Sequence, residues 1–245
     1  MRYAIISDIH SNLESLQIFL QYLNQLKIEK VLFLGDLVGY NANPNECIEI
    51  LSRFNNLETI RGNHDRAIIE NDYYYFSDNA KEAIRWTIKN ISQSSYIYLN
   101  KIEQGPKIID NAFAICHGSA LDEDDYLLAP VYTKGDFLWL KENNINLLFF
   151  GHTHYQTAYT LSKKNKIETI KKYEIKIKPD VCYLINPGSL GQPRDNDRRA
   201  SFAVYDSEKQ KVNIIKYDYP FEITQRKIRS NNLPSFLAER LAYGR

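Results

Sequence analysis

The sequence has few cysteines, and they form no pattern. Only three occur among 245 residues, Cys47, Cys116 and Cys182, and no two of them make a Cys-x-x-Cys pair. A disulfide framework needs more cysteines in a shorter chain, and structural zinc sites are commonly built from closely spaced cysteines. The three distant cysteines supply neither, and they indicate reduced thiols in a cytoplasmic protein.

Long apolar runs and an excess of charge of one sign are also missing. No stretch approaches the roughly 20 apolar residues of a membrane span, and the N-terminal run reaches Asp8 too early for a signal peptide. The 31 basic and 30 acidic residues give a formal net charge of +1, without the basic excess typical of nucleic-acid-binding proteins. We therefore expect a cytoplasmic globular protein with no membrane partner, and nucleic-acid binding is disfavoured.

The sequence does contain an alternation of apolar strands and amphipathic helices. Buried strands are predicted at 4–6, 31–34 and 57–60, and helices over 12–26 and from Pro44 onward. This order is typical of an α/β fold (α+β by some schemes) with parallel strands. Further strands are predicted at 113–116, 147–150, 182–185, 201–205 and 212–217, with an exposed hairpin over the lysine-rich stretch 163–178. Since no repeat or linker interrupts the chain, we expect one domain over 1–245.

Residues 66–103 interrupt this alternation. They are rich in Tyr and Asn, and apolar residues recur at helical spacing, which predicts a helical cover near the functional site. The run Tyr73-Tyr74-Tyr75-Phe76 has two possible roles, stacking on a base or aryl group and packing between helices. Packing is favoured, because aromatic clusters usually lie inside proteins.

All five histidines follow predicted strands, in short clusters with Gly, Asp or Asn. They are His10, His64, His117, His152 and His154. Because ligand crevices of α/β sheets lie at the carboxyl ends of strands, these side chains can converge in space. Taken alone, each cluster is a weak signal, and Asp8-x-His10, like the neighbouring Gly35-Asp36, can be read as an ordinary turn. Their joint occurrence, which uses every histidine of the chain, favours a metal site.

Five motifs occur in the order that calcineurin-like metallophosphoesterases show. They are Asp8-Ile9-His10, Gly35-Asp36, Gly62-Asn63-His64-Asp65, His117 and Gly151-His152-Thr153-His154. Four further segments, Ser11-Asn12, 186–189, Gln192-Pro193-Arg194 and 233–241, resemble the small bacterial and archaeal branch related to diadenosine tetraphosphatases and serine/threonine phosphatases. The resemblance implies a four-layer sandwich of two mixed β-sheets flanked by helices.

The resemblance also implies a binuclear centre whose ligands are carboxylates, imidazoles and one amide. The first metal would be held by Asp8, His10 and His154, and the second by Asn63, His117 and His152, with Asp36 bridging. Two cations roughly 3.5–4 Å apart would hold a bridging hydroxide that attacks a phosphoryl group in line. Ligation by nitrogen and oxygen without thiolate suits two divalent ions of Mn, Fe, Zn, Co or Ni.

Three further residues are candidates for catalysis or substrate binding. His64 is assigned no metal, and its ordinary pKa of about 6.5 suits proton donation to a leaving alkoxide; a structural or ligand-orienting role is the alternative. Asn12 and Arg194 are candidate substrate contacts, although residues 186–194 can also be read as a simple Gly/Pro turn. Eukaryotic-type phosphatases place an Asp and an Arg after Gly-Asp. Residues 37–40 lack both, and Asp65 is the candidate to orient His64 instead.

We therefore expect a metal-dependent phosphoesterase that hydrolyses phosphodiester or phosphomonoester bonds of a small substrate, nucleotides included. The alternatives are a phosphoprotein phosphatase, a nuclease and an inactive phosphoesterase-like interaction scaffold. The missing Asp and Arg argue against the first, the balanced charge against the second, and the complete ligand set against the third. Substrate, metal identity and oligomeric state stay open.

Overall fold

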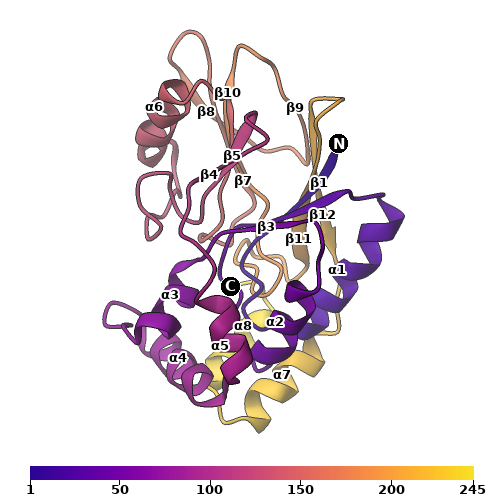
Figure 1. Cartoon of the computed structure of the whole chain (residues 1–245), viewed down its shortest axis with the longest axis vertical. Coiled ribbons are helices and arrows are strands. Elements are labelled where there is room, and N and C mark those ends of the chain that lie inside the picture. The colour runs from indigo at the N-terminus through magenta and orange to yellow at the C-terminus, as the bar shows by residue number, and fades with distance from the viewer.

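Two mixed six-stranded β-sheets form the centre of the molecule, in a computed structural model that describes all 245 residues (Figure 1). The first sheet has the order β3-β2-β1-β11-β12-β9: β1 (Arg2–Ile6), β2 (Lys30–Phe33), β3 (Leu57–Thr59), β9 (Glu174–Lys176), β11 (Ala200–Asp206) and β12 (Lys211–Tyr217). The second has the order β4-β5-β6-β10-β7-β8: β4 (Lys107–Ile109), β5 (Phe113–Ile115), β6 (Leu147–Phe149), β7 (Thr157–Leu161), β8 (Ile167–Ile170) and β10 (Cys182–Asn186).

Each sheet contains one block of parallel strands. In the first sheet β1, β2 and β3 run parallel, and in the second β5, β6 and β10 do. The remaining pairs are antiparallel. Because parallel strands end at the same edge, the loops that follow them are brought together.

Eight α-helices flank the sheets. They are α1 (Leu13–Gln25), α2 (Pro44–Ser52), α3 (Asn63–Glu70), α4 (Asp78–Asn90), α5 (Gln93–Leu99), α6 (Lys134–Glu142), α7 (Phe221–Ser230) and α8 (Ser235–Leu241). A short 3₁₀ helix, η1 (Pro130–Thr133), precedes α6. The predicted α/β sandwich is confirmed. None of these helices combines the length and apolar character that a membrane crossing requires.

Alternating side chains of the strands divide the core into layers. On β1, Tyr3 and Ile5 lie in the apolar cluster between the two sheets, where Phe113 of β5 also packs. The intervening Ala4 and Ile6 belong to a separate cluster formed with α1 and α2. Since successive strand residues point to opposite faces, a strand buried on both sides reads as a continuous apolar run. A third cluster packs α6 against the outer face of the second sheet.

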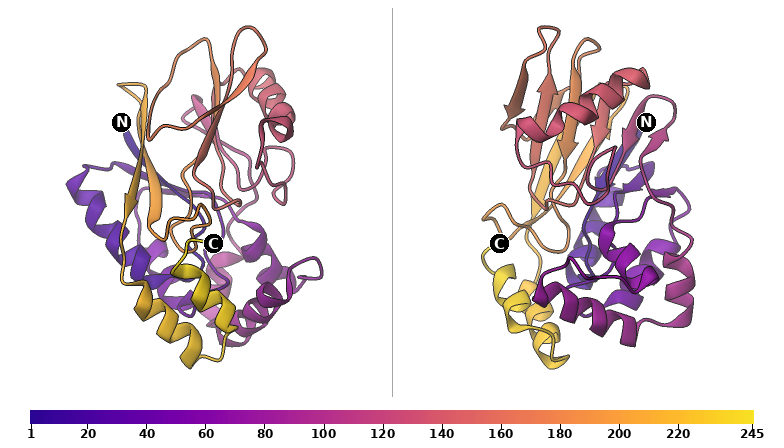
Figure 2. Two further views of the ribbon diagram at one scale, coloured as in Figure 1. Left: turned by 180° about the vertical axis from the view of Figure 1, so that it is seen from behind. Right: turned by 90° about the vertical axis from the view of Figure 1, so that its left-hand side faces the viewer.

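Helices α3, α4 and α5 occupy most of the predicted cover segment 66–103. Figure 2 shows the yellow C-terminal helices beside this purple segment at one end of the molecule. Contact between them is apolar: Ala80 and Ala83 of α4 share a buried cluster with Ile228 of α7 and Leu237 of α8. The C-terminal helices therefore pack against the cover segment, far from it in sequence.

The predicted exposed hairpin over 163–178 is wrong. Strand β8 pairs with β7 in the second sheet, whereas β9 pairs with β12 in the first, so the two strands do not pair with each other. Ile175 of β9 is buried in the core between the sheets. The alternation of Lys and Ile specifies extended chain, but it does not specify the strand partner, which here lies more than 30 residues away for β9.

Phe202 is the aromatic centre of the layer between the first sheet and α1. It is fully buried, and its ring lies 5.1 Å from that of Phe19 and 6.0 Å from that of Tyr217. We expect Phe202→Ala to lower the free energy of unfolding by about 3–5 kcal/mol, because it removes apolar contacts and leaves a cavity. Urea unfolding measures this. Phe236→Ala, at a side chain 51% exposed, is the control, and a loss there equal to that of Phe202→Ala would contradict the prediction.

Candidate metal centre and substrate cavity

The loops that follow the parallel strands of both sheets converge at one edge. They bring together all seven predicted ligands: Asp8 and His10 after β1, Asp36 after β2, Asn63 after β3, His117 after β5, and His152 and His154 after β6. Two groups have ligand atoms within 4.8 Å of one another: Asp8, His10, Asp36 and His154, and Asp36, His117 and His152. Asp36 belongs to both.

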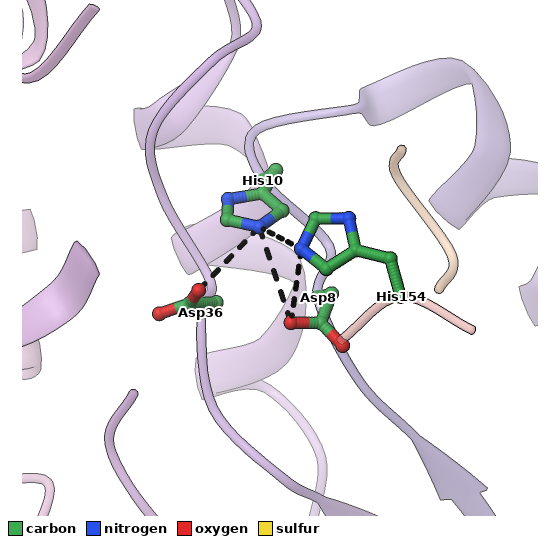
Figure 3. A group of neighbouring side chains, drawn as sticks. All are labelled: Asp8, His10, Asp36 and His154. Carbon is green, nitrogen blue, oxygen red and sulfur yellow. Dashed lines mark hydrogen bonds and ion pairs between the residues drawn. The ribbon is translucent and has the colours of Figure 1, made fainter. Parts of the chain in front are cut away.

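Figure 3 shows the first group, and the distances to the second group show how closely the two groups meet. Oδ2 of Asp36 lies 3.4 Å from Nε2 of His10 and 3.4 Å from Nε2 of His117. Oδ1 of Asp8 lies 3.4 Å from Nε2 of His154, whose Nε2 is 3.0 Å from that of His10. Oδ1 of Asn63 is 3.2 Å from Nε2 of His117.

The ligand loops have an unusual backbone. Asp8, His10, Asp36, His152 and His154 have φ values of 56°, 45°, 63°, 62° and 58°. Few residues other than glycine adopt this left-handed region, and such conformations cluster at functional sites where the surrounding structure enforces them. Here they turn consecutive side chains toward one centre.

Backbone carbonyl groups orient the imidazole rings. The Nδ1 atoms of three histidines each lie within hydrogen-bond distance of a carbonyl oxygen: His10 with Val38 at 2.9 Å, His117 with Leu34 at 2.8 Å and His154 with Gln192 at 2.6 Å. A carbonyl only accepts, so Nδ1 carries a proton and Nε2 faces the centre, where a neutral ring offers its lone pair. His152 is turned the other way, with Nε2 3.2 Å from the Asp124 carbonyl oxygen.

The chemistry of the donor set fits a bound cation. Asp8 is fully buried, and neither of its carboxylate oxygens has a hydrogen-bond partner. Burial raises the pKa of Asp8, an effect that His117 opposes and Asp36 increases. A buried carboxylate without donors is costly unless an opposite charge compensates it. A cation held by this cluster would supply that charge.

The histidines of the cluster suit the same interpretation. Burial lowers the pKa of His10, His152 and His154 well below the ordinary value. These imidazoles are therefore neutral, and the neutral ring is the form that binds metals. His117 differs, because the carboxylate of Asp36 overcomes the effect of burial and raises its pKa.

The motif made Asp65 the candidate to orient His64, but its carboxylate makes no hydrogen bond to the His64 side chain. Its carboxylate instead accepts hydrogen bonds from four backbone amides: Asp36 at 2.9 Å, Leu37 at 2.9 Å, Val38 at 3.2 Å and Gly62 at 3.1 Å. It thereby ties the turn after β2 to the beginning of α3. The side chain is fully buried. It fixes the backbone of Asp36 and of Val38, whose carbonyl group contacts Nδ1 of His10.

His64 lies beside the cluster in an aromatic enclosure. Its ring centroid is 4.4 Å from that of Tyr40 and 4.8 Å from that of Phe76, and its Nδ1 is buried without a hydrogen-bond partner. Its amide donates to Oδ1 of Asp36 at 2.8 Å, and burial lowers the pKa of the ring to about 4. Gly39, at φ of 94°, is required here, because a Cβ would meet Nδ1 of His64 at 2.6 Å.

A cavity of about 520 Å³ opens next to the cluster. Asn63 and His152 line it, so candidate ligands face it directly. The other lining side chains are mainly aromatic and basic: Tyr40, Tyr126, the run 73–76, Arg66, Arg194 and Arg240. Within the run, Tyr73 and Phe76 pack against the core as predicted, whereas Tyr74 and Tyr75 are 75% and 95% exposed.

The two predicted substrate contacts have different environments. Arg194 lines the cavity, where its Nη2 donates to the Tyr40 hydroxyl at 3.2 Å and to Oε1 of Gln192 at 3.0 Å. Asn12 is fully buried away from the cavity. Its Oδ1 accepts from the Ser15 amide at the beginning of α1, and its Nδ2 donates to the Gly191 carbonyl. We therefore assign Asn12 to capping this helix rather than to substrate, because both ends of its amide are occupied.

Sequence reasoning missed the loop 119–128. Its Asp124 carbonyl contacts His152, and its Tyr126 ring lies 3.9 Å from the His152 ring. The side chains of Glu123 and Asp124 form ion pairs with Arg66 of α3, which hold the loop in place. The only available signal was the acidic run 122–125, which carries no family motif.

The fold and the buried Asp/His cluster are those of a metal-dependent hydrolase. More specifically, the chain belongs to the calcineurin-like phosphoesterase superfamily, whose domain model matches residues 1–210. The predicted family is confirmed, and with it a metal-dependent phosphoesterase class.

Full-length relatives agree with this assignment. The chain is 36% identical to Uncharacterized protein MJ0912 of Methanocaldococcus jannaschii over 250 residues. The aligned region covers 99% of this chain and 98% of that protein. The crystal structure of a metallophosphoesterase from Sphaerobacter thermophilus matches with a TM-score of 0.84 at 30% identity, over 100% of this chain and 99% of that one. Hypothetical protein PH1004 of Pyrococcus horikoshii OT3 shares the fold, with a TM-score of 0.81 at 22% identity over 100% and 98%.

Asp65 offers a test of how the backbone supports the centre. We expect Asp65→Asn to weaken metal binding roughly 10- to 100-fold, because each carboxylate oxygen accepts two of the four amide donors, so two of them would face the new side-chain N–H₂. Metal titration followed by elemental analysis measures this, with the exposed Asp218→Asn as the control. Unchanged metal affinity in a folded Asp65→Asn protein would contradict the assigned role.

Proposed function

We propose that this protein is a phosphoesterase that uses two divalent cations to hydrolyse phosphodiesters or phosphomonoesters, nucleotides among them. The observation that carries the proposal is the position of Asp36. One of its oxygens lies 3.4 Å from Nε2 of both His10 and His117, which belong to different ligand groups. A shared carboxylate is how proteins hold two cations in one site.

Each cation would have its own set of protein ligands. Asp8, His10 and His154 would hold one, and Asn63, His117 and His152 would hold the other, with Asp36 shared by both groups. These nitrogen and oxygen donors suit Mn, Fe, Zn, Co or Ni. When bound, the cations would supply Lewis acidity toward a phosphoryl oxygen and would lower the pKa of a water molecule.

The protein's own contribution is positioning and charge. The carbonyl groups of Leu34, Val38 and Gln192 hold three rings so that their lone pairs face the centre. Arg194 binds a phosphoryl oxygen from the cavity side, since no carboxylate neutralises its guanidinium and its planar fork matches a phosphate. The substrate would therefore lie between the cluster and Arg194.

His64 would act on the leaving group. It adjoins Asn63 without joining either ligand group, and its Nδ1 has no protein partner. Because burial lowers its pKa to about 4, the ring is neutral near pH 7 and would donate a hydrogen bond to the oxygen on which charge develops. Its contacts with Tyr40 and Phe76 keep the ring in one orientation.

The exposed tyrosines support substrates with an aromatic part. Tyr74 and Tyr75 lie on the loop between α3 and α4, line the cavity and are largely open to solvent. Tyrosine rings stack on nucleobases and aryl groups through their flat apolar faces. A nucleotide fits both the rings and the phosphate-binding end of the cavity.

The first test is metal dependence. Protein treated with a chelator should not hydrolyse bis(p-nitrophenyl) phosphate or p-nitrophenyl phosphate, and Mn²⁺ or another of the five metals should restore turnover. We expect Asp36→Asn to lower kcat on the order of 10³-fold, because several kcal/mol of transition-state stabilisation depend on the cations. Asp218→Asn should retain full activity. Absence of turnover in the wild type with every metal would instead favour an interaction scaffold.

The second test concerns His64. We expect His64→Ala to slow hydrolysis of a methyl ester of a nucleotide by about 10²- to 10⁴-fold, because the charge that develops on the poor leaving group needs a hydrogen-bond donor. The p-nitrophenyl ester of the same nucleotide should slow much less, since its leaving group is stable without protonation. Metal content should stay constant. Equal slowing of both esters together with loss of metal would assign His64 to ligand positioning.

A further inference from the structure

Helix α8 forms part of the cavity wall. It lies beyond the residues that the family model matches. The match ends at residue 210, whereas α8 spans Ser235–Leu241 and its Arg240 lines the cavity with Arg194. Leu237 and Leu241 of the same helix are buried in the cluster that includes Tyr40. The helix is thus fixed to the body of the protein, and Arg240 has a defined position.

Arg194 and Arg240 are the two cations of the cavity that no acidic side chain pairs with. Arg66, the third basic residue in its wall, forms an ion pair with Asp124 at 2.8 Å. Arg240 donates through Nε to the main-chain oxygen of Arg245, the last residue of the sequence, and lies 5.4 Å over the Phe236 ring. Its two terminal nitrogens form no hydrogen bond with the protein, so they stay free to bind a ligand.

The acidic residues of the wall do not compensate these two arginines. Asp124 forms an ion pair with Arg66, and Oε1 of Glu70 lies 3.7 Å from Nη1 of Arg61. Asp72 is exposed and accepts a hydrogen bond from the Tyr74 amide. Burial together with the proximity of Arg194 lowers the pKa of Arg240 to about 10, which shows that two like charges share a partly desolvated space.

We propose that Arg240 forms a second phosphate-binding subsite, so that the preferred ligand carries another phosphate group besides the one at the candidate metal centre. Two guanidinium groups without an acidic side chain as partner, in one cavity, match two phosphates, because each retains N–H groups that can donate to phosphate oxygens. A cavity of about 520 Å³ also has the size of a nucleotide-binding site. The ligand class is a nucleoside diphosphate or bisphosphate.

This inference rests on the proposed function for the position of the first phosphate, but its test does not require turnover. We would measure binding of AMP and of its α,β-methylene diphosphate analogue to the metal-reconstituted protein by isothermal titration calorimetry. The two ligands share the nucleoside and differ by one phosphate group. The phosphate at the candidate metal centre would be bound in the same way by the wild type and the variants. The difference in affinity between the two ligands therefore measures the contribution of Arg240.

The variants are Arg240→Gln, Arg240→Lys and, as the control, Arg229→Gln at an exposed position of α7. We expect Arg240→Gln to weaken binding of the diphosphate analogue about 10- to 100-fold and that of AMP less than twofold, because only the analogue reaches the second subsite. Arg240→Lys, which retains the charge, should lose less. Arg229→Gln should bind both ligands like the wild type.

Two results would overturn the subsite. Arg240→Gln would weaken both ligands equally if Arg240 served only the first phosphate or the fold, and it would weaken neither if the side chain did not contact ligand. Failure of the proposed function is separate, because it appears as absence of hydrolysis by the wild type. Binding of the diphosphate analogue through Arg240 without any hydrolysis would support the subsite and contradict the proposed enzymatic function.

Discussion

The burial of Asp8 and Asp36 beside one another is the constraint on which the rest of the site depends. Two carboxylates without solvent repel each other and lose hydration, so they persist only where positive charge or donors compensate them. Asp36 accepts a hydrogen bond from the His64 amide at 2.8 Å, whereas neither carboxylate oxygen of Asp8 has a hydrogen-bond partner. The neutral histidines around Asp8 leave a cation as the natural partner. The left-handed turns and the carbonyl contacts of the rings serve this arrangement.

The candidate centre joins the two halves of the sandwich. The first sheet supplies Asp8, His10, Asp36 and Asn63, and the second supplies the remaining three histidines. Neither sheet holds a complete set of ligands. The apolar layer between the sheets, with Tyr3, Phe113 and Tyr205 in edge-to-face contact, therefore sets the distance between the two ligand groups. Core packing and metal binding are coupled through this layer.

The cavity has a different origin from the ligand cluster. Asn63 and His152 form the part of its wall that belongs to the ligand-bearing turns. Much of the remaining wall comes from the loop before α4, the loop 119–128 and the C-terminal helix α8, which lie between or beyond those turns. A chain can change these loops and α8 while the ligand-bearing turns stay the same, because the loops and α8 carry none of the candidate ligands.

The sequence by itself determined the family, the α/β order and the seven candidate ligands that converge at one edge, because each of them sits in a short motif directly after a predicted strand. Tertiary structure decided what depends on distant partners. Asn12 caps α1 and reaches Gly191, 179 positions away, and β9 joins the first sheet through β12. Asp65 secures backbone amides 27–29 positions earlier, and Arg240 enters the cavity only through packing of α8. Local patterns specify residue types and periodicity, whereas these roles arise from contacts that form after the chain has folded.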